Sequence, residues 1–586
     1  MTTYRKLSEK QRTALRTQGC CAENWDDIEV APEFDTATVH ATRFAGRVRL
    51  GGQVRLYGVG LLKNYSVGRG ACIENTAVVE CRTPSAFGNG TVVRPVNEAG
   101  GREVTIYCGL TAQTAYLCAM WRHRPLLAPR IARLAEEFAG SQRSELGTVG
   151  EGATVRGCGF VRECSIGSGT TVEGALCLEN GTVEGGPGGG ARVGCGVTAR
   201  DFIISRGAEV GTGACLERCF VGEGCRIGKG FSAVDSLFFA NCECENGEAC
   251  AVFAGPYTVS HHRSSLLIAG FFSFFNAGSG TNQSNHLFKA GAIHQAVHRR
   301  GCKFASDAYT MAPCVEAPFT TVIGRHKSHH DTDDFPFSYL LESEGRSMLM
   351  PGANLRSYGT VRDIAKWERR DRRRAPEAER RDQIIYARYN PYIAQGALRA
   401  IAVSQELLRK EGDTLTYKHV RIKKTMLRLG LKSYDLLLRA SLGEMLGAEA
   451  RSECDGTGSW TDIAGLYAPK REAERIAEAL ESGEAGLAEA DARFAGLARS
   501  YRDYARSWAL DALARRLGHT PSAEEIRAAV ADGEQARAAL DAATAADSRH
   551  DCGMEFAVGY GTDADPAQAA EIEADYRAVR GELFAE

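Results

Sequence analysis

The side chains best suited to chemistry are concentrated in residues 278–338. This stretch holds six of the thirteen histidines of the chain, interspersed with amides and carboxylates. Groups of this kind are costly to bury and contribute little to packing, so their density favours a binding or catalytic site over a hydrophobic core. A solvated loop with hydrogen-bonded histidines is the alternative interpretation.

Proton transfer is the first chemistry that these residues would support. A neutral imidazole accepts a proton from an attacking hydroxyl or amine, while an amide or a backbone N–H group holds a developing oxyanion. We predict three histidines as catalytic residues: His286, His294 and His326. The predicted substrate-binding residues are the polar side chains around them: Asn282, Gln283, Asn285, Gln295, Ser306, Asp307, Arg325 and Asp331.

Metal binding is a second chemistry to consider. His294 and His298 lie four apart, a spacing that would place both on one face of a helix. The glutamate of an HExxH motif is missing between them. His326, His329 and His330 are equally well interpreted as a solvated loop. We therefore assign no metal ligands from the sequence.

The elements that must position this stretch are predicted from an apolar period of six, with occasional steps of five. Amphipathic helices recur at 3.6 and ordinary strands at 2, so this period is typical of hexapeptide repeats. Each hexapeptide supplies a short strand and a turn, and three form one coil of a left-handed parallel β-helix. The inward-facing residues are predicted to be Val67, Ile73, Val78, Val149, Val155, Val161, Ile166, Val172, Leu178, Val183, Val210, Leu216, Val221, Ile227 and Ala233.

Three regions follow from these patterns. Residues 1–42 are predicted as a helical lead-in, and residues 43–360 as the β-helix with a helical insertion at about 95–143. Residues 361–586 are rich in Ala, Glu, Arg and Leu at helical spacing, which predicts an α-helical region. Within it, the mixed arginines and carboxylates of residues 362–381 favour an exposed, salt-bridged helix over an RNA site. A set of bulky residues is predicted to close the interior of the β-helix: Phe238, Phe239, Phe271, Phe272, Phe274 and Phe275.

Overall composition limits the partners and the compartment. The formal net charge of -2 over 586 residues provides no general attraction for nucleic acid or an anionic membrane surface, so neither is expected as a partner. The sequence has no run of about 18 apolar residues and no apolar leader at its start. We expect a cytoplasmic protein whose twenty cysteines stay reduced. The group Cys242, Cys244 and Cys250 lacks a matching second CxxC pair and is interpreted as packing.

Several phrases of the sequence resemble a known family. YRKLSEKQRTALRTQGCCAENW, GSGTNQSNH, SDAY, DFPFSYL and LMPGANLRSYGT are similar to an uncharacterised bacterial family, domain of unknown function 4954. The resemblance implies a hexapeptide β-helix, an inserted helical piece and a helical C-terminal region. It implies no activity.

Hexapeptide solenoids more broadly resemble acyltransferases that use acetyl-CoA or acyl carrier protein. These commonly form trimers and use a histidine as general base. The resemblance implies acyl transfer to a sugar or nucleotide-sugar acceptor, with acetyl-CoA or another acyl donor as cofactor, in a homotrimer. Two alternatives stay open: a non-enzymatic sugar-nucleotide binding or scaffold protein, and a metal site like that of the γ-class carbonic anhydrases.

Overall fold

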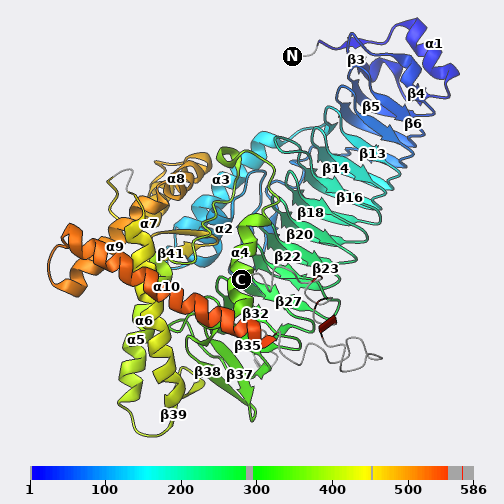
Figure 1. Cartoon of the computed structure of the whole chain (residues 1–586). Helices are drawn as coiled ribbons and strands as arrows, with labels where there is room; N and C mark the ends of the chain where they lie inside the picture. The colour runs from blue at the N-terminus through cyan, green and yellow to red at the C-terminus, as the bar shows by residue number, and fades with distance from the viewer. Residues whose placement is uncertain are drawn as a thin grey trace.

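The computed structural model describes residues 3–284, 295–449 and 453–551, together with residues 570, 571, 574 and 578. A parallel β-solenoid runs from the N-terminal end to about residue 350, and helices lie along one flank and at its C-terminal end (Figure 1). The predicted parallel β-solenoid and the helical C-terminal part are therefore confirmed.

Successive coils of the solenoid pair in parallel and keep their register. Val155 in β13 (Thr154–Arg156) pairs with Val172 in β15 (Thr171–Glu173), one coil later. Of the predicted inward-facing residues, all but Val78 are buried. Val78 is displaced by its neighbour Val79, which is fully buried, because adjacent strand residues point to opposite faces.

The N-terminal segment covers the first coil. Helix α1 (Glu9–Thr17) begins with the capping box that the sequence suggests, and its Leu15 is buried in the solenoid core. Strand β2 (Cys21–Ala22) already pairs in parallel with β5 (Arg43–Leu50), so strand pairing starts before residue 43. The helix shields apolar groups that an open solenoid end would expose to water.

The insertion leaves the solenoid between β9 (Val78–Glu80) and β12 (Gly147–Val149). It lies against the flank of later coils (Figure 1). Its elements are β10 (Val92–Val93), β11 (Val104–Thr105), α2 (Ala112–Met120) and α3 (Leu127–Gln142).

An outward-facing aromatic column explains where the insertion packs. Phe271 and Phe272 are neighbours in β28 (Gly270–Phe272), but they point in opposite directions. Phe272 lies in the solenoid core, whereas Phe271 contacts Tyr116 of α2 at a ring-centroid distance of 5.3 Å. Half of the predicted interior aromatics, Phe238, Phe272 and Phe275, face the solenoid core. Phe239 and Phe271 instead belong to the apolar cluster shared with the insertion.

The basic residues 362–381 do not form one exposed helix. Helix α4 (Tyr358–Arg369) ends early, and the chain then runs extended along the solenoid to residue 390. Arg381 donates to Glu184 at 2.6 Å, and Arg372 donates to Glu243 at 2.9 Å. The prediction of a salt-bridged helix was wrong because these guanidinium groups pair with carboxylates of distant coils.

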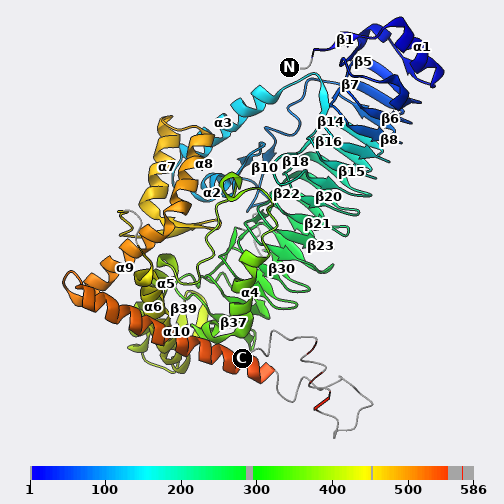
Figure 2. The same ribbon diagram turned by 45° about the horizontal axis from the view of Figure 1, so that its top comes forward.

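The remaining chain forms helices and two antiparallel hairpins that the sequence reading missed. Helices α6 (Lys424–Gly447) and α10 (Ala523–Asp551) cross where a Cβ on Gly443 would lie 2.6 Å from Cα of Gly533, so the crossing needs glycine (Figure 2). The helices are α5 (Pro391–Leu408), α6 (Lys424–Gly447), α7 (Lys470–Ser482), α8 (Leu487–Arg499), α9 (Tyr501–Leu517) and α10 (Ala523–Asp551). The hairpins are β39 (Thr414–Tyr417) with β40 (Val420–Lys423), and β41 (Trp460–Ile463) with β42 (Leu466–Pro469).

One buried arginine joins the solenoid to the helical region. Arg300 donates to both carboxylate oxygens of Asp462, at 2.7 and 3.2 Å, and to the carbonyl oxygen of Gly465 at 2.6 Å. Its guanidinium lies between the rings of Phe274 and Tyr467, at 4.2 and 3.9 Å from their centroids. Charge, hydrogen bonds and stacking together hold the hairpin β41–β42 against the coils.

Among the described residues, no helix combines the length and the apolar character needed to cross a lipid bilayer.

Candidate functional site

One inward-facing column of the solenoid changes from apolar to polar near its C-terminal end. Phe272 pairs with His298 of β31 (Ala296–His298), and His298 pairs with Glu316 of β34 (Val315–Glu316). Earlier positions of the same column hold Val221, Phe238 and Ala254. The side chains of His298 and Glu316 are fully buried, so a carboxylate and an imidazole occupy the place of core aliphatics.

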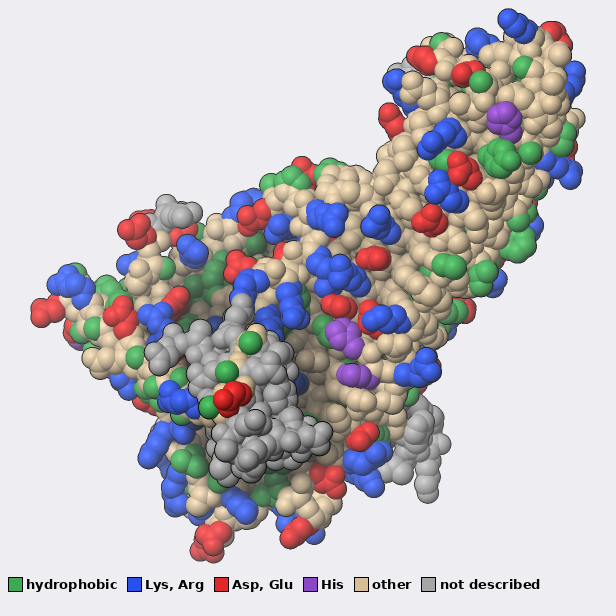
Figure 3. Space-filling model, turned by 45° about the vertical axis from the view of Figure 1, so that its right-hand side comes forward, with side chains coloured by type: hydrophobic (Ala, Val, Ile, Leu, Met, Phe, Trp, Pro, Cys, Tyr) green, Lys and Arg blue, Asp and Glu red, His purple; other side chains and the backbone are tan. Residues whose placement is uncertain are grey.

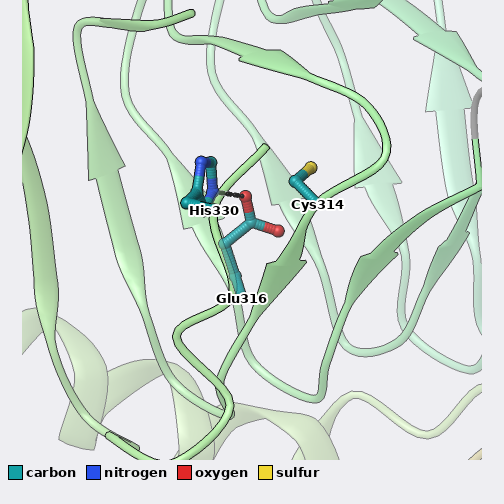
Figure 4. Close-up of side chains that lie close together, drawn as sticks. All are labelled: Cys314, Glu316 and His330. Carbon is teal, nitrogen blue, oxygen red and sulfur yellow. Dashed lines mark hydrogen bonds and ion pairs between the residues drawn. The ribbon is translucent and has the colours of Figure 1, made fainter. Parts of the chain in front are cut away.

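The carboxylate of Glu316 lies between two imidazoles. Its Oε2 is 2.6 Å from Nδ1 of His298, and its Oε1 is 2.7 Å from Nε2 of His330 (Figure 4). The second ring nitrogen of His330 faces the carbonyl oxygen of Ser328 at 3.1 Å. Both ring nitrogens of His330 therefore have hydrogen-bond partners. We call His298, Glu316 and His330 the triad.

The surroundings determine how these groups titrate. Burial alone would raise the pKa of Glu316, but the charges and hydrogen bonds of His298 and His330 hold it well below its usual value. Burial and the nearby charge of Glu316 raise the pKa of the Cys314 thiol well above its usual value. Cys314, Glu316 and His330 each direct one metal-ligating atom into a space in which these atoms lie within 4.8 Å of one another.

A second inward-facing column adds polar groups beside this triad. Gln283 in β30 (Asn282–Ser284) pairs with Thr310 in β33 (Tyr309–Met311), and Thr310 pairs with His326 in β36 (Arg325–His326). All three are fully buried. His326 Nδ1 and Ser347 Oγ form a hydrogen bond of 2.9 Å. The ring centroids of His326 and His330 lie 5.9 Å apart. Burial is the main cause that lowers the pKa of His326 to about 4, and repulsion from His330 is the second cause.

The predicted site residues divide according to the side of the strand on which they lie. Gln283 and His326 point into the interior, and the ring of His326 lies beside that of His330. Their strand neighbours Asn282 and Arg325 are half-buried and exposed, respectively, because side chains alternate along a strand. Three predicted residues, Asn285, His286 and His294, lie outside the described residues.

The other predicted binding residues are not brought together with His326. Ser306 and Asp307 are exposed in a turn, where Asp307 has a positive φ of 58°. Gln295 accepts from Arg102 of the insertion at 2.9 Å. Asp331 accepts from Lys418 at 2.9 Å. These four residues have local structural partners or face water, so the structure does not gather them into one site.

Sequence reasoning missed Glu316 and Cys314, and it left a solvated loop open as an equal interpretation of His330. His330 is in fact fully buried. The helix proposed for His294 and His298 is also wrong for the part that the structure describes, because His298 lies on strand β31. If the regular spacing of the coils had continued after Phe272, the sequence would have shown that His298 and Glu316 occupy inward-facing positions. The chain between β30 and β31 is longer than one turn of this spacing, so the positions could not be assigned from the sequence.

A surface pocket separate from the interior lies between the solenoid, α4 and the extended segment after it. We call it the α4 pocket, a cavity of about 300 Å³. Figure 3 shows Lys, Arg and His side chains gathered on a face where the helical region meets the solenoid. The pocket is lined by Asn241, Glu243, Tyr257, Val259, His261, Phe274, Phe275, Asn276, Gly301, Cys302, Lys303, Arg362, Asp363, Lys366, Trp367, Arg370 and Arg372.

Cations outnumber anions in the α4 pocket. Five Lys and Arg residues face two carboxylates, and Arg372 is fully engaged with Glu243 and with backbone carbonyl oxygens. Lys366 and Arg370 form no side-chain hydrogen bond or ion pair with any residue that the structure describes. Burial and the nearby charges of Arg362 and Arg370 lower the pKa of Lys366. The pocket therefore holds positive charge that its own side chains do not neutralise.

The same pocket contains an aromatic wall and a histidine paired with a carboxylate. Trp367 packs edge-on against Phe274 with centroids 4.6 Å apart, and Phe274 stacks on Tyr257 at 5.3 Å. His261 Nε2 lies 3.4 Å from Glu243 Oε1. The hydrogen bond with His261 lowers the pKa of Glu243 to about 2; Arg372 contributes to this lowering, and burial opposes it. The Glu243 carboxylate is therefore ionised at neutral pH.

Comparison with known proteins identifies relatives but no activity. The profile of the family "Domain of unknown function (DUF4954)" matches residues 4–59 and 50–408, and that of "Domain of unknown function (DUF6819)" matches residues 443–586. An uncharacterised protein of Treponema pallidum (strain Nichols) is 26% identical over 418 residues, which cover 63% of this chain. The match spans 58% of that relative's own length.

Proposed function

This chain belongs to the DUF4954 family, and we propose that it binds a phosphorylated ligand of the sugar-nucleotide class in the α4 pocket. The observation that carries the proposal is the pair of unneutralised cations, Lys366 and Arg370, in a cavity of suitable size. Ligand pockets have volumes of roughly 300–1,000 Å³, and this one lies at the lower end of that range.

The charge of the pocket favours an anion as ligand. The neighbouring cations Arg362 and Arg370 repel the ammonium group of Lys366, and a bound phosphate would relieve that repulsion. Guanidinium groups bind phosphate oxygens with two parallel hydrogen bonds, and Arg370 is free to do so among the described residues.

The aromatic wall favours a ligand that also carries a ring. Trp367, Phe274 and Tyr257 present flat apolar surfaces next to the cations. A base or a sugar ring packs against such surfaces, and the carboxylates Glu243 and Asp363 offer acceptors for hydroxyl groups. A diphosphate bearing a sugar or a base combines these requirements.

Calorimetric titration of the full chain with UDP, a UDP-sugar and inorganic pyrophosphate tests this proposal. We expect the double variant Lys366→Ala/Arg370→Ala to weaken binding by roughly a hundredfold or more, because each of the two lost charged hydrogen bonds contributes about 1.5–3 kcal/mol. Arg369→Ala is the matched control, since Arg369 lies on the same helix end but does not line the pocket.

Two results would overturn the binding proposal. One is the absence of heat or thermal stabilisation with all three ligands at millimolar concentration. The other is equal affinity in the wild type and in the double variant, which would place any binding elsewhere. If pyrophosphate binds as tightly as the UDP-sugar, the phosphate contacts dominate and the assignment of a ring-bearing ligand fails.

Acyl transfer is a second candidate function, favoured by the His261–Glu243 pair in the same pocket. With Nε2–H donating to Glu243, Nδ1 of His261 is left to accept a proton. An acceptor hydroxyl would lose its proton to Nδ1 and attack the thioester carbonyl of acetyl-CoA. The C–S bond then breaks, and the thiolate of CoA takes the proton from His261.

Release of free CoA thiol in the presence of sugar nucleotides measures this reaction. We expect His261→Gln to abolish turnover, whereas the neighbouring His262→Gln should leave it unchanged, because His262 does not line the pocket. No thiol release by the wild-type chain with any acceptor would leave binding as the function. Equal losses in both variants would contradict the role of His261.

The remaining parts of the proposal concern architecture and assembly. Buried aliphatics in steps of six and five residues, such as Val155, Val161, Ile166 and Val172, support assignment to the left-handed hexapeptide class. Solenoids of that class commonly associate through their flat sides, so a homotrimer is our proposal. Light scattering at micromolar concentration should give three times the mass of 63.2 kDa, and a monomer mass would exclude a trimer.

A further inference from the structure

We infer that Cys314, Glu316 and His330 form a buried site for a single Zn²⁺ ion inside the solenoid. A thiolate, a carboxylate and an imidazole are all ligands that zinc accepts. Their ligating atoms lie within 4.8 Å of one another, and all three residues are buried. In the close-up, Cys314 and Glu316 come from one segment, and His330 of the neighbouring segment points at Glu316 (Figure 4).

The chemistry of the donor set is the first argument for a metal ion. Cys314, Glu316 and His330 offer one sulfur, one oxygen and one nitrogen, which are the donor atoms that zinc uses in proteins. Around bound Zn²⁺, the thiolate and the carboxylate would balance the two positive charges of the ion, so the interior would avoid the cost of a buried net charge.

Binding an ion would require the ligating atoms, which now lie within 4.8 Å of one another, to adjust their separations by about an ångström. Ligating atoms around tetrahedral zinc lie roughly 3.3 Å apart, given bond lengths of about 2.0–2.1 Å to nitrogen and oxygen. The present distance from Glu316 Oε1 to His330 Nε2 is 2.7 Å, so the ion would separate these two atoms slightly. Glu316 Oε2 keeps its hydrogen bond from His298, which orients the carboxylate as outer partners of metal ligands do.

A buried hydroxyl lies next to the cysteine of the cluster. Thr310 Oγ1 is buried beside the Cys314 side chain. A hydroxyl next to a metal-bound sulfur would orient that ligand, as outer partners of metal ligands do. The chain therefore offers three ligands, and a water molecule would take the fourth position around the ion.

The wild-type full chain allows a test that needs no substitution. Protein produced without chelator should contain about one zinc per chain, and X-ray absorption should show one sulfur at about 2.3 Å with nitrogen and oxygen at about 2.0–2.1 Å. Because the ligands are fully buried, EDTA should remove this zinc from native protein far more slowly than from protein unfolded in guanidinium.

Variants then assign the ligands. Cys314→Ser should lose most of the zinc, while Cys302→Ser should retain it, because Cys302 is an equally buried cysteine outside the cluster. Cobalt-loaded wild-type protein should show a thiolate-to-cobalt absorption band that Cys314→Ser lacks. The inference is overturned if zinc is absent after refolding with excess zinc, if the zinc shell contains no sulfur, or if both cysteine variants keep the metal equally.

Discussion

Glu316 accepts a 2.6 Å hydrogen bond from His298, its strand partner in the preceding coil, inside a column that is otherwise apolar. A buried carboxylate is stable there only because imidazoles face both of its oxygens. The pair therefore links the stability of the last coils to the protonation of a few side chains.

Removing the central charge should destabilise the fold. For metal-free protein we expect Glu316→Gln to lower the free energy of unfolding by about 3–5 kcal/mol, because the buried imidazoles of His298 and His330 both lose the carboxylate that they face. Denaturant unfolding followed by circular dichroism measures the change. Glu342→Gln is the control, since Glu342 is an exposed residue that accepts a hydrogen bond from the backbone N–H of Arg325. Equal stabilities for the two variants would contradict the prediction.

The same carboxylate predicts how stability depends on acid. The pKa of Glu316 is lower in the folded chain than its ordinary value of 4.5. Its stabilising effect is therefore complete above about pH 4.5 and is lost as the pH falls towards the folded pKa. The thermal midpoint of wild type should drop below pH 4.5, and Glu316→Gln should show less of this drop. A parallel fall in both proteins would mean that other carboxylates cause it.

His326 predicts a second dependence on pH, in a higher range. Its folded pKa is about 4, against an ordinary value of 6.5, so the unfolded chain binds a proton more readily between these values. Stability should be complete above pH 6.5 and decline as the pH falls from 6.5 to 4. In His326→Gln, the unfolding free energy should depend less steeply on pH in this range, because unfolding no longer takes up the one proton that His326 binds. His329→Gln, at an exposed position, should leave it unchanged; a slope insensitive to His326 would refute the assignment.

Arg300 should behave as a structural bridge between the solenoid and the helical region. Arg300→Met leaves the carboxylate of Asp462 without its buried partner and should cost about 3–5 kcal/mol. Adding Asp462→Leu should recover part of this loss, because the unpaired charge is then removed. Chemical denaturation of the two single variants and the double variant completes the cycle. Losses that simply add would show that the two groups are not coupled.

Asp491 should respond to pH in the opposite direction from Glu316. It accepts hydrogen bonds from Thr111 and Thr114 of the insertion, and burial raises its pKa to about 7. A raised carboxyl pKa adds stability at low pH that is lost as the pH rises from about 4 to 7. Relative to wild type, Asp491→Asn should gain in thermal midpoint between pH 5 and pH 8, measured by scanning fluorimetry. Asp413→Asn, an exposed control, should show no such gain.

The sequence by itself determined the solenoid and its inward-facing aliphatics. Val155, Val161 and Val172 recur at a spacing that neither a helix nor an ordinary strand shares, so local pattern alone identified them. The capping box at Ser8 and the helical composition after residue 361 are local signals of the same kind. Such features depend on neighbours within a few residues and can be read without knowing the tertiary fold.

Only the tertiary structure decided which polar residues meet. His298, Glu316 and His330 are brought together by the register of adjacent coils, and a shift of one residue would turn each side chain outwards. The α4 pocket likewise joins Glu243 to Lys366 across a long separation in sequence. A period of six predicts that coils stack, but the length of each turn sets which residues face one another. That length is decided by insertions and by packing on the flank, which no local pattern contains.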